Sequence, residues 1–280
     1  MMNLWYSLVD WLLPFDWTNH MFMKNALLAI ILVCPLFGLL GTMIVNNKMA
    51  FFSDAIGHSA LTGIAIGVLL GLEKPTLSML AFSIILALAI SGARNISLNS
   101  TDTIIGIFSS TAVALGIVIL SKGGGFSKYS SYLIGDLLSI SPNDLVLLIM
   151  VFFAIIIIWV LMFNKLFVSS INKSLAVSKK VNTVLVDTVF TLIVAVIVTI
   201  SIQWLGILII SSLLVLPAGS ARNLSSNMKQ YHALSITLSL IPGILGLILS
   251  YYMGTATGAT IVLVSAVFYF ITLPLARIRN

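Results

Sequence analysis

Charge is scarce in this chain. Only 8% of its 280 residues are charged, while 60% are hydrophobic. A soluble domain carries about 25% charged residues, so the composition excludes an ordinary soluble protein and indicates a polytopic membrane protein. The 14 Lys and Arg residues exceed the 8 Asp and Glu residues, giving a net charge of +6. Because the basic residues flank apolar runs, they indicate membrane topology and not nucleic-acid binding.

Cysteine and the common enzyme motifs are also lacking. The single cysteine, Cys34, excludes an internal disulfide and any Cys-x-x-Cys metal or redox site. No Gly-x-x-x-x-Gly-Lys-Ser/Thr loop or His-Glu-x-x-His motif occurs. Asp136 follows Gly135, but Leu133 stands where the Gly-x-Gly-Asp motif of intramembrane aspartyl proteases needs glycine. The sequence therefore predicts no enzyme, and any ATP hydrolysis must be performed by another polypeptide.

Apolar runs dominate what is present, and a helix needs about 20 apolar residues to cross a bilayer. The runs predict an all-α polytopic protein with about eight or nine transmembrane helices, near residues 26–46, 55–72, 76–93, 102–121, 145–163, 183–202, 204–221, 231–252 and 258–276. Residues 132–140 are too short to cross alone and predict a half-helix or re-entrant piece. Residues 1–23 are rich in aromatic side chains and predict an interfacial segment in contact with membrane lipid, before a single transmembrane domain over residues 24–280.

The longest polar interruption, residues 164–182, contains four lysines and no acid, which predicts a cytoplasmic loop. Counting spans forward places Arg222 and Lys229 inside, residues 251–257 outside and the C-terminus inside. The orientation of the N-terminal half depends on whether residues 132–140 cross, which leaves it open.

An acid and an imidazole four residues apart, Asp54 and His58, are the strongest functional signal. On a helix, such a pair lies on one face and can converge on one point. Ionisable groups at membrane depth usually face a water-filled path or a partner. A carboxylate with an imidazole suits manganese, iron or zinc. Two alternatives are a helix cap by Asp54 with a structural hydrogen bond from His58, and a proton relay.

Other polar residues carry weaker signals. Asp102 precedes an apolar run, which favours a role at the start of a helix. Asp187 follows the basic loop, where a pair with Lys180 or an interfacial position is expected. His20 and His232 lie at the ends of predicted spans, where interfacial positions are expected.

Four blocks of sequence resemble the integral permeases of manganese, zinc and iron ABC importers. The first, Phe51-Phe-Ser-Asp-Ala-Ile-Gly-His-Ser-Ala-Leu-Thr-Gly63, contains the acid and the imidazole, and the others are residues 105–117, 132–136 and 206–222. The blocks occur in the family's order, and the resemblance runs from about residue 24 to residue 276.

The resemblance implies the all-helical fold of vitamin B12 and siderophore importers. It implies a permease homodimer in a bacterial cytoplasmic membrane, with two ABC ATPase subunits and an external metal-binding receptor. No permanent cofactor is expected; the cargo is manganese or zinc, with iron as a further candidate. Both copies would place Asp54 and His58 on a dimer-axis path. The alternative is an ion-coupled secondary metal transporter.

The resemblance also places a coupling helix for the ATPase within residues 164–182. The aligned residues are Ser170, Asn172, Lys173, Ser174 and Ala176. Asn172 and Ser174 stand where relatives usually carry acids. A second departure is residues 254–258, which lack the Asp and Pro common in the family.

Overall fold

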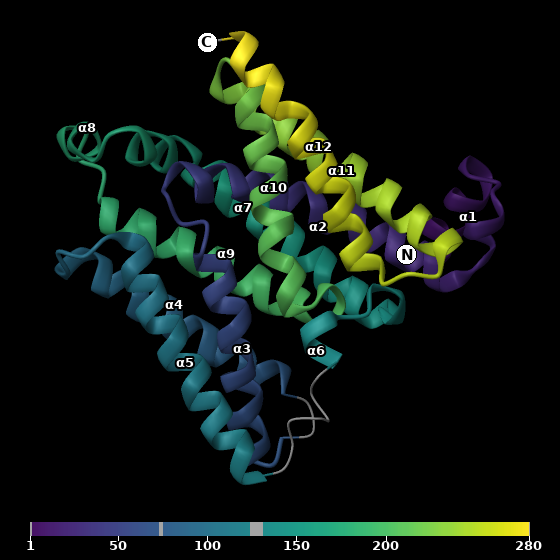
Figure 1. Cartoon of the computed structure of the whole chain (residues 1–280), viewed down its shortest axis with the longest axis horizontal. Helices are drawn as coiled ribbons and strands as arrows, with labels where there is room; N and C mark the ends of the chain where they lie inside the picture. The colour runs from purple at the N-terminus through teal and green to yellow at the C-terminus, as the bar shows by residue number, and fades with distance from the viewer. Residues whose placement is uncertain (1, 73–74, 124–130, 280) are drawn as a thin grey trace. The chain divides into compact units, whose positions relative to one another are not determined.

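The computed structural model describes residues 2–72, 75–123 and 131–279, and every regular element in these ranges is helical. The long helices are α2 (Met21–Asn46), α3 (Phe52–Leu69), α4 (Thr76–Ile96), α5 (Thr101–Gly123), α7 (Pro142–Ile171), α9 (Thr183–Leu205), α10 (Ile207–Leu224), α11 (Met228–Met253) and α12 (Thr257–Arg279) (Figure 1). The short ones are α1 (Met2–Leu12), η1 (Asp16–Asn19), α6 (Ser131–Ile134), η3 (Leu137–Ser139) and α8 (Lys173–Ser178). The predicted fold class is confirmed.

Each of the nine predicted spans coincides with one long helix. Within the described ranges, 8 helices are long and apolar enough to cross a membrane, and α10 has a shorter apolar part, Ile209–Leu224. The prediction of eight or nine transmembrane helices therefore holds. Between α5 and α7, the helices α6 and η3 are separated by Gly135, whose φ is +73°. Both are too short to cross a bilayer.

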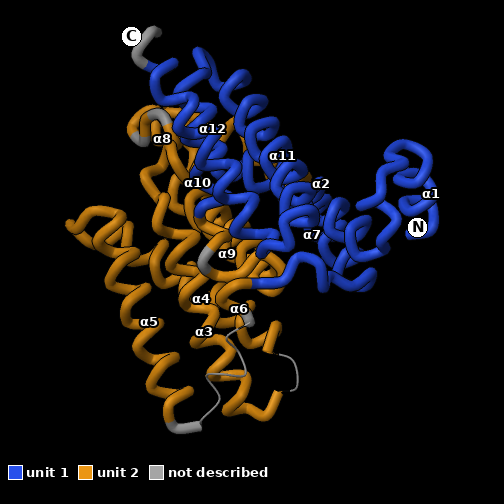
Figure 2. Tube along the Cα trace, turned by 45° about the vertical axis from the view of Figure 1, so that its right-hand side comes forward, with its two compact units in different colours: residues 1–42, 135–154, 212–280 blue, residues 43–134, 155–211 orange. Residues whose placement is uncertain are grey.

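The chain forms two compact units (Figure 2). Unit 1 contains residues 1–42, 135–154 and 212–280, and unit 2 contains residues 43–134 and 155–211. Because the chain passes from one unit to the other four times, the units are not successive domains along the sequence.

Within unit 2, small residues allow α3 to pack closely against both α4 and α5. The Thr62 hydroxyl donates to the carbonyl of Ala112. A Cβ at Gly116 would lie 2.6 Å from Thr62 Oγ1, and a Cβ at Gly63 would lie 2.5 Å from Met79 Cα. Glycines at such contacts let membrane helices approach at backbone distance.

Helices α4 and α9 of unit 2 are antiparallel. The hydroxyls of Ser91 and Thr188 are 2.8 Å apart, and Gln203 Nε2 donates to Thr76 Oγ1 at 2.6 Å. Late residues of one helix therefore meet early residues of the other. The end of α4 and the beginning of α9 lie at the same end of unit 2.

Within unit 1, hydroxyl groups join α2 to α11. Ser235 Oγ donates to the Gly38 carbonyl at 2.6 Å, and Ser239 Oγ donates to the Cys34 carbonyl at 2.7 Å. Such interhelical bonds contribute where the hydrophobic effect between membrane helices is weak.

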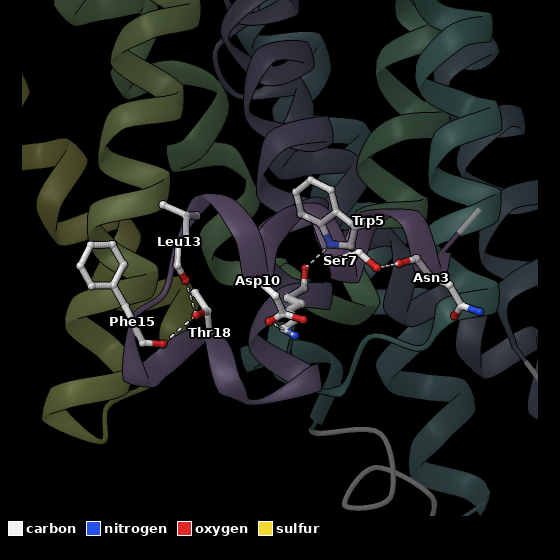
Figure 3. A network of polar contacts seen from close by, with 8 residues as sticks. Asn3, Trp5, Ser7, Asp10, Leu13, Phe15 and Thr18 are labelled. Carbon is white, nitrogen blue, oxygen red and sulfur yellow. Dashed lines mark hydrogen bonds and ion pairs between the residues drawn. The ribbon is translucent and has the colours of Figure 1, made fainter.

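The N-terminal segment is attached to the start of α2 by polar contacts. Trp5 Nε1 donates to the Lys24 carbonyl at 3.0 Å, and Lys24 Nζ pairs with Asp10 Oδ1 (Figure 3). The Tyr6 hydroxyl donates to Asn25 Oδ1 at 2.9 Å. These bonds hold α1 against the span that follows it.

The turn after α1 is held by hydrogen bonds within the turn. Several apolar side chains of residues 1–23 are exposed. Thr18 Oγ1 donates to the carbonyls of Leu13 and Phe15 (Figure 3). Trp11 is 81% exposed and Phe15 is 55% exposed. An apolar cavity of about 570 Å³ is lined by side chains of this segment, of α2 and of α11. The interfacial position of residues 1–23 stays a prediction, which these exposed aromatic side chains favour.

Candidate metal centre

Asp54 and His58 both lie in α3, one turn apart. The helix begins at Phe52, and no side chain caps its N-terminus. Asp54 is thus inside the first turn, where its carboxylate is turned toward other side chains and does not act as a cap. The capping alternative is therefore not what the structure contains.

The carboxylate of Asp54 meets two partners. His58 Nε2 lies 3.5 Å from Asp54 Oδ1. Ser211 Oγ, from α10, donates to the same Oδ1 at 3.3 Å. The His58 side chain is 31% exposed and that of Asp54 is 42% exposed, so both groups remain open to an incoming ion.

The separation of the two candidate ligand atoms fits joint coordination of one ion. Zinc binds imidazole nitrogen and carboxylate oxygen at about 2.0–2.2 Å. At a tetrahedral angle, two such ligand atoms lie about 3.4 Å apart. The observed 3.5 Å between His58 Nε2 and Asp54 Oδ1 is close to that value. A single ion can therefore bridge the two groups without a large movement of either.

A groove of about 690 Å³ in unit 2 contains the pair. Its walls come from α5, α3 and the residue that precedes α3. The lining residues are Phe51, Asp54, His58, Asp102, Ile105, Gly106, Ser109, Ser110, Val113, Ala114 and Ile117. Two carboxylates, an imidazole and two serine hydroxyls thus share one groove with a wall that is otherwise apolar.

One chain supplies two ligands at this centre and no more. In the described ranges, no group of three or more His, Cys, Asp or Glu residues is placed to hold a metal ion. Two protein ligands are fewer than the four of a closed zinc site. A metal ion bound by this pair would need further ligands.

Two residues were not assigned to this centre from the sequence: Ser211, which contacts Asp54, and Asp102, which lines the groove. Ser211 lies in the block 206–222, and its hydroxyl in an otherwise apolar run is the signal that could have drawn attention to it. Asp102 does lie in the first turn of α5, as expected. Its position on the same face as Ser109, one to two turns later, is the signal that it also faces a polar path.

The remaining histidines have other partners. His20 Nε2 lies 3.2 Å from the Tyr251 hydroxyl, and its ring stacks on Phe22. His232 is only 8% exposed, and its Nδ1 lies 2.8 Å from Thr42 Oγ1. His232 is thus a buried, hydrogen-bonded residue near the beginning of α11, and its interfacial position stays a prediction. The structure brings neither histidine into the groove.

Two further acids have local roles. Asp136 accepts a hydrogen bond from the backbone N–H of Leu138 at 3.1 Å and so caps η3. Asp187 interacts electrostatically with Arg94. Neither lines the groove.

The segment in which a coupling helix was expected contains the short helix α8. Asn172 caps it by accepting from the backbone N–H groups of Ser174 at 2.9 Å and Leu175 at 3.2 Å. The Ser170 hydroxyl donates to a carbonyl of its own helix, at 2.9 Å. The side chain of Lys173 lies outside the described part of the chain. Asn172 therefore has a structural reason to occupy a place where an acid was expected, because both residue types cap helices well.

The surface of α8 was not foreseen from the sequence. Ala176 is fully buried, whereas Leu175 is 45% exposed and Val177 is 63% exposed. The exposed apolar pair is followed by Lys179 and Lys180.

Comparison with known protein families identifies the family of this chain. Residues 19–276 match the family described as the ABC 3 transport family. The chain belongs to the ABC 3 transport family. It is a membrane permease, and the resemblance stated from its sequence blocks is confirmed. The 8 candidate spans agree with a multi-pass protein of the bacterial inner membrane.

Two relatives come from different transport systems. The high-affinity zinc uptake system membrane protein ZnuB of Haemophilus influenzae is 31% identical over 253 residues, covering 89% of this chain and 95% of the relative. The manganese transport system membrane protein MntC of Listeria monocytogenes is 28% identical over 253 residues, covering 90% of each chain.

A solved structure is similar over its whole length. The structure of PsaBC from Streptococcus pneumoniae in complex with Fab contains a chain with a TM-score of 0.79 and 26% identity, and the similarity covers 100% of both chains. The fold predicted from the sequence is thereby matched in a solved permease structure.

Proposed function

We propose that this chain is the permease of an ATP-driven importer of divalent metal, with zinc or manganese as the cargo and iron as a further candidate. The observation that carries the proposal is the Asp54–His58 pair, whose candidate ligand atoms are 3.5 Å apart and line a groove that also contains Asp102 and two serines. The names of the relatives support it, since they belong to zinc and manganese systems.

The complete metal site is formed by two copies of the chain. Each copy contributes Asp54 and His58, so a two-fold axis through the groove gives two carboxylates and two imidazoles. Four such ligands match the coordination number of zinc, and added water matches the higher number that manganese accepts. The two-ligand centre in each described chain supports this arrangement, because it is incomplete alone.

The short elements between α5 and α7 support one choice for the orientation that the sequence left open. Because residues 131–139 are too short to cross, counting back from a cytoplasmic loop at 164–182 puts the N-terminus outside. Lys48 and Arg94 are then inside, and with α10 counted as a span Arg222 and Lys229 are inside as well. Ten of the 14 Lys and Arg residues are cytoplasmic in this topology, as the positive-inside rule favours.

Two ATPase subunits dock on α8, and an external metal-binding receptor delivers the ion. The exposed Leu175 and Val177 support the first part, because they offer an apolar contact on the cytoplasmic side. ATP is hydrolysed on the separate ATPase chains, since the sequence has no phosphate-binding loop. Residues 24–280 act as one permease domain, whose two interleaved units cannot separate along the chain, and residues 1–23 lie at the lipid interface.

The test is uptake of zinc, manganese and iron by proteoliposomes that contain the permease and its ATPase, with the receptor outside. We expect ATP-dependent uptake that Asp54→Ala and His58→Ala abolish. His20→Ala is the matched control, because it removes an exposed imidazole that lies outside the groove. Uptake that persists without the ATPase contradicts an ABC importer and indicates a secondary carrier. Uptake that survives both groove variants contradicts the proposed site.

A further inference from the structure

Asp102 lines the groove together with the proposed metal ligands. Asp102, Gly106 and Ser109 follow one another at spacings of four and three residues, which places them on one face of α5. All three are groove residues, as are Asp54 and His58. Asp102 is exposed. Its carboxylate makes no hydrogen bond or ion pair with any residue in the described ranges, so it is available to a cation.

Asp102 is not a third ligand of the same ion but the next group along the groove. Thr62 contacts Ala112 and Gly116, and Asp54 shares a groove with Asp102, so α3 and α5 run in the same direction. The contacts of Thr62 give an offset of about 52 residues between the two helices. Asp102 then precedes the level of Asp54 by about four residues, or about 6 Å along the helix axis. This separation agrees with the absence of any three-ligand cluster in the described chain.

In the proposed topology, Asp102 lies closer to the cytoplasm than Asp54 does. The end of α4 and the beginning of α9 lie at the same end of unit 2. The beginning of α9 follows the basic loop, and α5 starts at Thr101, directly after α4. Asp102, at the start of α5, is therefore on the cytoplasmic side of Asp54.

We propose that Asp102 is the next carboxylate that the metal meets after it leaves Asp54 and His58 on its way into the cell. The inference rests on the proposed import function. A divalent ion leaving two or four protein ligands must regain oxygen ligands, and a carboxylate one turn away supplies one before bulk water is reached. Several weak sites in series allow an ion to leave as well as to enter.

A helix-start role makes a different prediction, which allows the two to be separated. A negative charge anywhere in the first turn of α5 stabilises that helix through its dipole. Thr103 is in the same turn but is not a groove residue. The backbone N–H of Thr103 donates to the hydroxyl of Ser100 at 3.2 Å, so Ser100 caps the start of α5. Asp102→Asn/Thr103→Asp thus keeps the charge in the first turn and removes it from the groove.

The experiment compares wild type, Asp102→Asn, Asp102→Glu and the double variant in proteoliposomes with the ATPase and the receptor. Initial uptake of zinc and manganese is measured against metal concentration, and the melting temperature of each purified permease is recorded. Asp102→Asn is expected to lower the maximal rate about tenfold, which corresponds to about 1.4 kcal/mol. The half-saturating concentration should change little, because loading at Asp54 and His58 is intact.

The double variant decides between the two roles. If Asp102 receives the ion, the double variant keeps the rate defect although its melting temperature returns to that of wild type, and Asp102→Glu retains most of the rate. A wild-type rate in the double variant, or in Asp102→Asn, overturns the inference. Failure of the proposed import function is recognised separately. Wild type would then show no ATP-dependent uptake, and Asp54→Ala would not differ from it.

Discussion

Replacing Gly63 by alanine tests how closely α3 must approach α4. The new Cβ would lie 2.5 Å from Met79 Cα and 3.1 Å from the Ser78 carbonyl oxygen. Carbon atoms in contact are normally about 3.5–4.0 Å apart. The two helices must therefore separate by about 1 Å, because the obstructing atoms are backbone and cannot rotate away.

The expected magnitude follows from two opposed effects. Overpacking at such a contact costs about 1–3 kcal/mol, while Gly→Ala inside a helix gains up to about 1 kcal/mol from helix propensity. The net change in the free energy of unfolding for Gly63→Ala is a loss of about 0–3 kcal/mol. Gly92→Ala is the matched control, since a Cβ at Gly92 meets nothing within 4 Å, and it should gain up to about 1 kcal/mol.

The assay is the midpoint of thermal unfolding of both purified variants in one detergent. At about 2–4 °C per kcal/mol for a large domain, Gly63→Ala should melt several degrees below Gly92→Ala. Uptake should fall in Gly63→Ala, because the displaced helix carries Asp54 and His58. A melting temperature for Gly63→Ala equal to or above that of Gly92→Ala would refute the close packing of α3 on α4.

Three further predictions concern the metal centre and the coupling helix. Ser211→Ala should raise the half-saturating metal concentration by about tenfold. This is the lower end of the loss in metal affinity seen when a residue that orients a ligand is replaced, because the Ser211–Asp54 hydrogen bond is long, at 3.3 Å. An equal effect of Ser212→Ala in the same uptake assay would contradict this. Asn172→Ala should destabilise α8 by about 1 kcal/mol and weaken co-purification of the ATPase, whereas Asn172→Asp, which keeps a capping oxygen, should not. Metal affinity measured by equilibrium dialysis should fall as the pH is lowered from about 8 to about 5, because a protonated imidazole has no lone pair for a metal; a slope unchanged in His58→Gln would assign the effect to another group.

Much of the fold could be predicted because hydropathy reports directly on membrane crossing. All nine apolar runs became helices, since an apolar segment in lipid has to satisfy its backbone hydrogen bonds internally. The boundaries were less accurate. The run expected to extend to residue 72 ends at Leu69 and is followed by Gly71 with a φ of +69°. Local backbone conformation of this kind leaves no trace in hydropathy.

The candidate site was predicted in part. The spacing of Asp54 and His58 was sufficient, because helix geometry alone brings residues four apart together. Ser211 and Asp102 could not be joined to them in this way, since their proximity depends on how α10 and α5 pack against α3. The burial of His232 could not be predicted for a similar reason, because the residue that it contacts, Thr42, is 190 residues away in sequence.

The chain itself connects the proposed docking surface to the proposed metal ligands. From α8, the chain continues through α9 to Gly206, whose φ of 81° and ψ of 152° are accessible to glycine and strained for other residues. Five residues later, Ser211 donates its hydrogen bond to Asp54. A movement of α8 with an ATPase can therefore be transmitted to the Asp54 carboxylate through α9 and the turn at Gly206. All of these residues belong to unit 2. In the proposed dimer, two copies moving apart would reduce a four-ligand shell to two ligands on each side. Release of the metal then follows from loss of ligands, without a change in the chemistry of any single residue.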